Sequence, residues 1–436
     1  MKFYNRENEL KLLSQIEEQS LKTAQMTFVV GRRRIGKTSL LTKAYSSDNC
    51  LYFFVAKKNE TLLCQEFLAE MKEKLKVPIF GNIKTFKDIF QILMEFSKTK
   101  NFTLIIDEFQ EFYTVNKSVF SDMQNIWDAN KEDSKINLIL CGSVYAMMSR
   151  IFENSKEPLF GRATQRIHLK ALDLQSLKII LTDYNPNYST DDLLAFYLFT
   201  GGVPKYIELF VQKSDLTFHS MLIEIFSENS IFLDEGKNVL IEEFGKEYAN
   251  YFSILTLIAS GKTSRVEIES ILEMQTGGFL DRLENEYGLI KKYRSILSKP
   301  NSRSVKYSIE DNFLSFWFRF IYKYRSAVEA GNLDYIKTIV IRDYKTYSGR
   351  ILEKYFIEKL KAEKKFNQIG TYWDKTNHNE IDIIAVNDLE KKVLFAEVKR
   401  QRENIRLSRL KEKSEKLKFK FKDYSFSYKG YALEDM

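Results

Sequence analysis

Residues 31–38 read Gly-Arg-Arg-Arg-Ile-Gly-Lys-Thr, which is a complete G-x-x-x-x-G-K-T phosphate-binding loop. The apolar run at 26–30 before it predicts a buried strand, and the segment at 39–45 after it predicts the start of a helix. The two glycines let the backbone turn its N–H groups onto phosphate oxygens, and the helix N-terminus adds partial positive charge. This order predicts a nucleotide site on a parallel α/β sheet. A glycine-rich turn with a solvated lysine is the alternative.

The loop residues predict specific contacts with a nucleoside triphosphate. Lys37 is expected to reach the β- and γ-phosphates, and Thr38 is expected to hold Mg²⁺ through its hydroxyl group. The backbone of the whole loop is expected to surround the phosphates. The predicted nucleotide-binding residues are Gly31, Arg32, Arg33, Arg34, Ile35, Gly36, Lys37, Thr38 and Ser39.

Two further apolar runs end in polar residues. The first ends in Asp107 and Glu108. Asp107 is expected to bind Mg²⁺ through water, and Glu108 is expected to polarise the attacking water. Consecutive strand positions point to opposite faces, so the two carboxylates need different roles. The second run ends in Ser143, and either Ser143 or Asn137 is expected to sense the γ-phosphate. Helix capping is the alternative for the acidic pair and for Ser143.

Composition limits the class of protein. A chain of 436 residues with 44% apolar content is expected to form two or three domains with real cores. The three cysteines form no C-x-x-C motif, which argues against a zinc ribbon or a disulfide framework and fits a reducing cytoplasm. No apolar run reaches the roughly 20 residues that a membrane span requires. We therefore expect a cytoplasmic protein with no membrane partner.

The net charge of +8 is unevenly distributed. Between Lys391 and Lys422 the chain has thirteen Lys and Arg residues and only four Glu residues. A solvated helix face is the usual meaning of such a run. Because the run overlaps and follows a candidate nuclease motif, it also predicts contact with a nucleic-acid backbone.

The pattern along the chain predicts four parts. Residues 1–170 alternate strand-like and helix-like segments, which is typical of a parallel sheet covered on both faces. Residues 171–246 are mostly helical and predict a lid. Residues 247–325 predict three helices and two strands, which is the order of a winged helix. Its third helix, with Arg282, is expected either to enter a major groove or to serve as a packing module. Residues 326–436 predict a separate α/β domain.

This last part carries a second constellation. The strand-like segments at 380–386 and 393–399 predict a hairpin that brings Asp382 close to Glu397 and Lys399. Two carboxylates can hold Mg²⁺, and the lysine can position water and neutralise charge on a scissile phosphate. An edge hairpin whose acid–base pairs face solvent is the alternative.

A helix predicted at 343–361 adds Glu353, which is expected to complete the acidic cluster of this second constellation. Carboxylate and hydroxyl oxygens suit a hard divalent cation. The metal ligands predicted for the two sites together are Thr38, Asp107, Glu353, Asp382 and Glu397.

On these motifs the chain resembles archaeal-type AAA+ ATPases close to the STAND branch of P-loop NTPases. The members that it resembles carry a C-terminal nuclease-like domain of the PD-(D/E)xK superfamily. The resemblance covers nearly the whole chain and rests on the segments 3–10, 31–38, 104–110, 140–143, 158–162 and 201–204. It implies a P-loop parallel sheet with a helical lid, a winged helix and a restriction-endonuclease-like α/β domain.

The resemblance also implies roles for individual residues. ATP is the implied nucleotide, and Arg162 is the implied arginine near its phosphates, from the same chain or from a neighbour, with Arg34 as the weaker candidate. The nuclease triad falls on Asp382, Glu397 and Lys399, with Ile381 where the superfamily has proline. The implied catalytic residues are Lys37, Asp107, Glu108, Arg162, Asp382, Glu397 and Lys399.

The sequence therefore predicts an ATP-binding and ATP-hydrolysing switch coupled to DNA binding and to Mg²⁺-dependent cleavage. A homo-oligomer is expected, because ring-forming relatives place an arginine in the neighbouring subunit's site. One alternative is a nucleotide-gated DNA-binding regulator with a catalytically silent C-terminal domain. The other is a signalling scaffold that binds protein, in which the basic stretch is a solvated surface.

Overall fold

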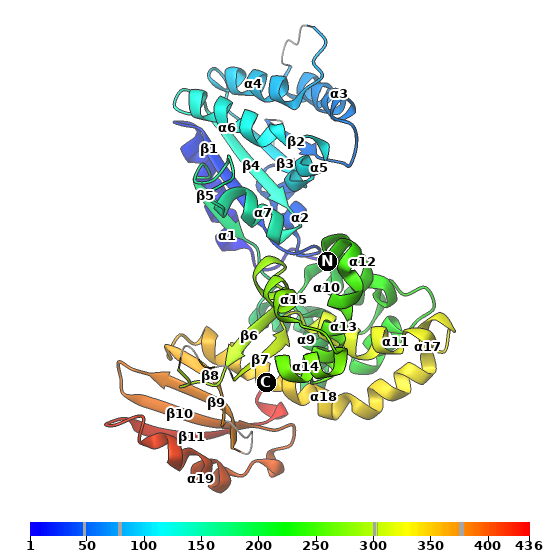
Figure 1. Ribbon diagram of the computed structural model, residues 1–436, viewed down its shortest axis with the longest axis vertical. Coiled ribbons are helices and arrows are strands. Elements are labelled where there is room, and N and C mark those ends of the chain that lie inside the picture. Colours follow the sequence, from blue (N-terminus) through cyan, green and yellow to red (C-terminus); the bar gives the residue numbers. More distant parts are fainter. Residues whose placement is uncertain (47–48, 77–80, 300–301, 303, 375–378) are drawn as a thin grey trace. The chain divides into compact units, whose positions relative to one another are not determined.

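The computed structural model describes residues 1–436 except 47–48, 77–80, 300–301, 303 and 375–378 (Figure 1). The chain forms two compact units. One comprises residues 4–171, and the other comprises residues 1–3 and 172–436. No helix within the described residues combines the length and apolar character that a membrane crossing needs.

The N-terminal unit contains a five-stranded parallel sheet with the strand order β2-β3-β4-β1-β5. The strands predicted from the sequence are present, and β5 is an additional edge strand. All residues of β1, β3 and β4 are buried, because helices cover both faces of these central strands. The strands are β1 (Gln25–Val30), β2 (Cys50–Phe54), β3 (Phe102–Asp107), β4 (Ile136–Gly142) and β5 (Gln165–His168).

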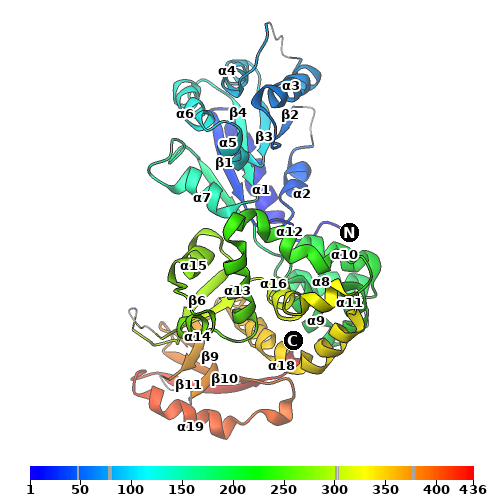
Figure 2. The same cartoon turned by 45° about the vertical axis from the view of Figure 1, so that its right-hand side comes forward.

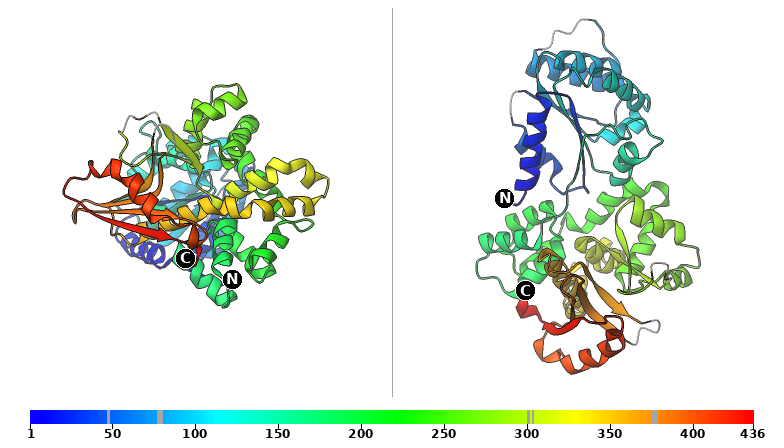
Figure 3. Two further views of the ribbon diagram at one scale, coloured as in Figure 1. Left: turned by 90° about the horizontal axis from the view of Figure 1, so that it is seen from below. Right: turned by 90° about the vertical axis from the view of Figure 1, so that its left-hand side faces the viewer.

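Helices form two layers around this sheet. Residues of α3, α4, α6 and α7 share one apolar core with the strands, whereas α1 packs on β1, β4 and α2. Figure 3 (right) shows α1, in dark blue, on the opposite side of the sheet from the cyan helices. The helices are α1 (Glu7–Ser20), α2 (Lys37–Ala44), α3 (Glu60–Glu70), α4 (Phe86–Ser97), α5 (Phe112–Val115), α6 (Ser118–Asn130) and α7 (Tyr145–Glu153).

The second unit begins with a mostly helical region, as predicted. Its core is rich in aromatic side chains: Phe199 packs against Phe316, and Phe232 packs against Phe210 and Phe313. The helices are α8 (Leu174–Tyr184), α9 (Thr190–Thr200), α10 (Pro204–Lys213), α11 (Phe218–Ile225), α12 (Phe232–Phe244), α16 (Asn312–Phe316) and α17 (Arg325–Glu329).

Three helices and a hairpin occupy the part of the sequence predicted to be a winged helix. The third helix, α15, continues through a wider turn at Arg282–Glu286, and β6 and β7 pair in antiparallel register. Figure 2 shows the hairpin next to these helices. The elements are α13 (Tyr248–Ala259), α14 (Arg265–Leu272), α15 (Gly277–Asp281), β6 (Ile290–Arg294) and β7 (Val305–Ile309).

The C-terminal part is a four-stranded sheet with the order β11-β10-β9-β8. Strands β8, β9 and β10 are antiparallel, and β10 and β11 are parallel. The long helix α18 packs on β8, β9 and β10, while α19 packs on β9, β10 and β11. The elements are α18 (Leu333–Ala362), β8 (Gln368–Trp373), β9 (Glu380–Asn387), β10 (Lys392–Val398), α19 (Leu407–Lys418) and β11 (Ser425–Tyr431).

The β6–β7 region is fastened to the edge of this sheet through Trp373. The Trp373 backbone N–H donates to Ser295 Oγ at 3.0 Å, and its indole N–H donates to Ser304 Oγ at 3.2 Å. The ammonium group of Lys306 lies 4.4 Å from the centre of the Trp373 ring. One backbone hydrogen bond, from Ile296 N–H to Thr371 O at 2.9 Å, extends the sheet towards the hairpin. The β6–β7 hairpin and strand β8 are therefore packed against each other.

Candidate functional site

The phosphate-binding loop has the geometry that its sequence predicts. Gly36 has φ +87°, which glycine adopts without strain, and α2 begins at Lys37. Gly31 also has no room for a side chain, because a Cβ there would lie 2.8 Å from the carbonyl oxygen of Leu169. The Lys37 ammonium donates to Gly31 O at 2.7 Å and to Arg32 O at 3.2 Å. Lys37 is therefore buried rather than solvated, and burial lowers its pKa.

Asp107 lies at the end of β3, next to the loop. Its Oδ2 accepts hydrogen bonds from Thr38 Oγ1 at 3.3 Å and from the hydroxyl of Tyr52. Tyr52 belongs to the neighbouring strand β2, and burial together with Asp107 raises its pKa. Thr38 and Asp107 thus form the predicted oxygen pair, which fits a Mg²⁺ ion. Tyr52 was missed by sequence analysis, since a tyrosine inside an apolar strand carries no motif.

Glu108 follows β3 in a left-handed conformation, with φ +54°. Its Oε2 accepts hydrogen bonds from Ser143 Oγ at 2.8 Å and from the side-chain amide of Gln110. Ser143 does not cap α7, since that helix has no side-chain cap. Asn137 sits near the amino end of β4 and donates to Thr103 at 3.2 Å. The prediction that Asn137 senses phosphate is therefore wrong, because the loop follows the carboxyl end of the parallel sheet.

Arg162 does not lie at this edge of the sheet in its own chain. Its guanidinium pairs with Asp128 at 3.0 Å, near the end of α6. Two residues on, Thr164 N–H donates to the carbonyl oxygen of Met26 at 2.7 Å, at the start of β1. The phosphate loop follows the other end of β1. The prediction that Arg162 acts within its own chain is therefore wrong, and only a role in a neighbouring subunit stays a prediction.

The second constellation assembles as predicted. Strands β9 and β10 form the antiparallel hairpin, and Asp382 Oδ2 accepts from Lys399 Nζ at 3.1 Å and from the Val398 N–H at 2.8 Å. Glu397 lies 3.9 Å from Lys399, and its other oxygen accepts from the Arg406 N–H at 2.7 Å, before α19. Burial works to lower the pKa of Lys399, but Asp382 and Glu397 outweigh it, so the pKa rises.

Glu353 of α18 faces the same group of charges. Burial, followed by the neighbouring Asp382, raises the pKa of Glu353 to about 8. This carboxyl group is therefore largely protonated at neutral pH. Within the described ranges, no group of three or more His, Cys, Asp and Glu side chains is arranged to hold a metal ion. The role of Glu353 as a third metal ligand stays a prediction. The two carboxylates Asp382 and Glu397 alone would suit a cation that keeps several waters.

The two candidate nucleic-acid surfaces differ in charge. On the third helix of the 247–325 region, Asp281, Asn285 and Glu286 are exposed. The guanidinium of Arg282 is occupied by Glu247 at 2.9 Å and lies over the rings of Tyr251 and Phe279. This helix therefore presents acidic side chains. In contrast, α19 and its flanks expose Arg406, Arg409, Lys411, Lys416, Lys420 and Lys422.

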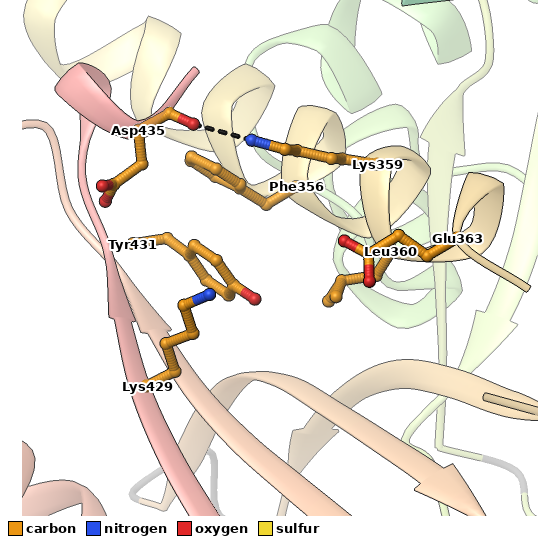
Figure 4. A pocket seen from close by; sticks show the side chains of 7 residues that line it. All are labelled: Phe356, Lys359, Leu360, Glu363, Lys429, Tyr431 and Asp435. Atoms are coloured by element: carbon orange, nitrogen blue, oxygen red, sulfur yellow. Dashed lines mark hydrogen bonds between the residues drawn. The ribbon is translucent and has the colours of Figure 1, made fainter. Parts of the chain in front are cut away.

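A small cavity of about 190 Å³ lies between α18 and β11 (Figure 4). Phe356 and Tyr431 stack with ring centroids 4.6 Å apart, and Lys359 donates to Asp435 O at 2.7 Å. Lys429 lies on the Tyr431 ring. The cavity mixes lysines with Glu363 and Asp435, so its charge selects no particular ligand.

Comparisons with known proteins support an ATPase domain in the N-terminal part of the chain. A family model described as an ATPase domain predominantly from Archaea matches residues 3–210. A family of archaeal and bacterial proteins of unknown function matches residues 317–419. An uncharacterized protein of Methanocaldococcus jannaschii is 31% identical over 406 residues, which cover 91% of this chain and 87% of that protein.

Two solved structures share the fold. The Walker-type ATPase of Pyrococcus abyssi has a TM-score of 0.55 and 19% identity, over 72% of this chain and 96% of that chain. The ORC2 protein of Aeropyrum pernix, solved in ADPNP–ADP complexes, has a TM-score of 0.52 and 14% identity, over 78% of this chain and 96% of that chain. At these identities the likeness establishes the fold alone.

Proposed function

The chain belongs to the same family as its Methanocaldococcus jannaschii relative and carries an ATPase domain of the archaeal type over residues 3–210. On this premise we propose that it is an ATP-dependent switch controlling a nuclease that acts on DNA. The observation that carries the proposal is the presence of two separate sites in one chain. One is the loop of Lys37 with Asp107, and the other is the Asp382–Lys399 pair beside the basic helix α19.

The ATP site can work by exchange of partners. Lys37 now donates to two carbonyl oxygens of its own loop, and the β- and γ-phosphates offer this cation stronger, charged acceptors. Thr38 and Asp107 would hold Mg²⁺, which when bound neutralises phosphate charge. Glu108 would take up the role of orienting the attacking water. Ser143, which now donates to Glu108, would turn towards the γ-phosphate.

At the second site, the residues would bind a metal ion, position water and hold the DNA backbone. Asp382 and Glu397 would hold Mg²⁺, which when bound polarises the scissile phosphate. Lys399 would position the attacking water and stabilise negative charge on the phosphate. The exposed bases of α19 would bind the DNA backbone in a salt-dependent manner, without reading its sequence.

Cleavage of supercoiled plasmid DNA with Mg²⁺ tests this site. Wild type should nick the plasmid, whereas Lys399→Ala and Asp382→Ala should lose at least about a hundredfold in rate, since both groups act on the reacting phosphate. Lys365→Ala is the matched control, because Lys365 is an exposed lysine outside the basic run that pairs with Glu363. Equal cleavage by all four proteins would remove the assignment.

A second candidate function is a nucleotide-gated DNA-binding regulator. The contact that favours it is the ion pair of Asp382 with Lys399, which leaves the acid and the base occupied by each other. This regulator would retain DNA in a gel shift, with a difference between ATP and ADP, and would show no metal-dependent nicking. Retention of no DNA at low salt would instead favour a scaffold that binds protein.

A further inference from the structure

Gln110 is a buried polar residue that none of the assigned roles uses. Its side chain has 0% exposure, and its amide nitrogen donates to Oε2 of Glu108. The same oxygen receives the hydroxyl of Ser143 at 2.8 Å. The backbone N–H of Ser143 is a third and longer donor to this oxygen, at 3.4 Å. Three donors on one oxygen fix the plane of the carboxylate and leave the other oxygen of Glu108 without any of them.

The space for this amide is created by a glycine. A Cβ on Gly142 would lie 2.4 Å from Oε1 of Gln110 and 2.5 Å from the Met148 side chain, so a larger residue there would displace these side chains. Within the described part of the chain, Oε1 of Gln110 has no hydrogen-bond partner. An apolar side chain of the same size would avoid this unfavourable burial. The amide nitrogen also reaches Oε1 of Glu111, but at 3.5 Å, so the contact with Glu108 is the main gain from an amide at this position.

We propose that Gln110 is a positioning residue for ATP hydrolysis, holding the Glu108 carboxylate in the orientation in which its second oxygen meets the attacking water. The proposal rests on the proposed role of Glu108. In the step, the water oxygen bonds to the γ-phosphorus and the bond to the β–γ bridging oxygen breaks. That oxygen leaves with the electron pair as part of ADP, and Glu108 takes the water proton and passes it to the released phosphate.

The arrangement also explains why Glu108 has two side-chain donors. When ATP binds, the Ser143 hydroxyl would turn from Glu108 to the γ-phosphate, and Gln110 would then be the side-chain donor that stays, beside the longer contact from the Ser143 backbone N–H at 3.4 Å. Without it, a carboxylate on a flexible side chain following a left-handed residue would sample several orientations. Misplacement of a catalytic group by about 1 Å lowers a rate by on the order of a hundredfold.

The test compares Gln110→Met with wild type and with Glu108→Gln. Methionine has a similar volume and no polar amide. Single-turnover hydrolysis should slow about 30- to 100-fold in Gln110→Met. The Kd for ATP should equal that of wild type, and the melting temperature should be equal or higher. A structural role would lower the melting temperature together with the rate. A rate within threefold of wild type, with Glu108→Gln inactive, would overturn the proposal for Gln110 alone. Full activity of Glu108→Gln would overturn the role of Glu108 itself.

A second variant pair keeps the proposal testable if Gln110→Met folds poorly. Gly142→Ala should displace the amide of Gln110 and slow hydrolysis to a similar extent. In the double variant Gly142→Ala/Gln110→Ala the two effects should not add, because both act through one contact. Full multiplication of the two rate losses would show that Gly142 and Gln110 act separately, and would contradict the proposal.

Discussion

The ATP site and the Asp382 site hold their charges in opposite ways. In the first, Lys37 donates to backbone carbonyl oxygens, and the Glu108 carboxylate accepts from a hydroxyl and an amide. In the second, Asp382 and Lys399 form an ion pair with each other. An incoming ligand at the first site replaces neutral partners, whereas at the second it must separate an ion pair. Under the proposed function, the first site is therefore ready for its nucleotide, and the second would need a metal ion or a phosphate to separate its ion pair.

The strongest way to break this comparison is Lys37→Ala. Removal of the cation that should meet the β- and γ-phosphates is expected to lower kcat/KM for ATP by about a thousandfold or more. Metal and DNA binding at the second site should stay unchanged. ATP hydrolysis and calorimetry with ATP and ADP measure the effect, and Lys22→Ala, at an exposed lysine of the same unit, is the control. Unchanged nucleotide binding would contradict the assignment of the loop.

The charge around the second site can be tested by reversal. Arg409→Glu with Lys416→Glu should weaken DNA binding about tenfold or more at 0.1 M salt and reduce the slope of log K against log salt by about two. A control of equal net charge reverses Lys22 and Lys72, which are exposed in the N-terminal unit. Fluorescence anisotropy with labelled duplex DNA measures both. Equal losses in the two proteins would show a general charge effect instead of a surface on α19.

The raised pKa of Glu353, at the second site, predicts a pH dependence of stability that can be measured. Because its pKa is raised from 4.5 to about 8, the folded state binds a proton that the unfolded state has lost, and stability falls as pH rises between these values. Glu353→Gln removes this loss. Its melting temperature should match that of wild type at pH 4.5 and exceed it at pH 8.5 by about 3–6 °C. A constant difference between the two pH values would contradict the raised pKa.

The smallest expected effect is that of Tyr52→Phe. Loss of the hydroxyl that donates to Asp107 should change the Mg²⁺ dependence of ATP hydrolysis by about threefold, since one hydrogen bond to a metal-binding carboxylate is removed. A magnesium titration at saturating ATP measures it. Thr42→Val on α2 offers a comparable loss of a hydroxyl outside this contact. Identical magnesium curves for all three proteins would show that Tyr52 has no influence on Asp107.

The sequence predicted most of the local structure and which residues lie together at the phosphate loop and at the Asp382 pair. Lys37, Thr38 and Asp107 could be found because a phosphate loop and an acidic strand end have fixed spacings, and Lys399 with Asp382 because strand alternation and pairing are regular. Tyr52, Gln110 and Gly142 could not be found in this way. Their importance depends on which strands are neighbours, and the order of parallel strands is not encoded in local periodicity. The role of Arg162 was implied by the family resemblance, and its position before β5, at the end of the sheet away from the phosphate loop, could not be read from the sequence.

The contacts that Ser295, Ser304 and Lys306 make with Trp373 have a consequence for expressing fragments of this protein. A fragment that starts at residue 326 would keep β8 but lose Ser295, Ser304 and Lys306, which cover its tryptophan. The exposed edge strand and indole ring would then pair with strands of other molecules, and the fragment would aggregate. Expression clones of the C-terminal sheet should therefore begin upstream of α13, so that the hairpin travels with it.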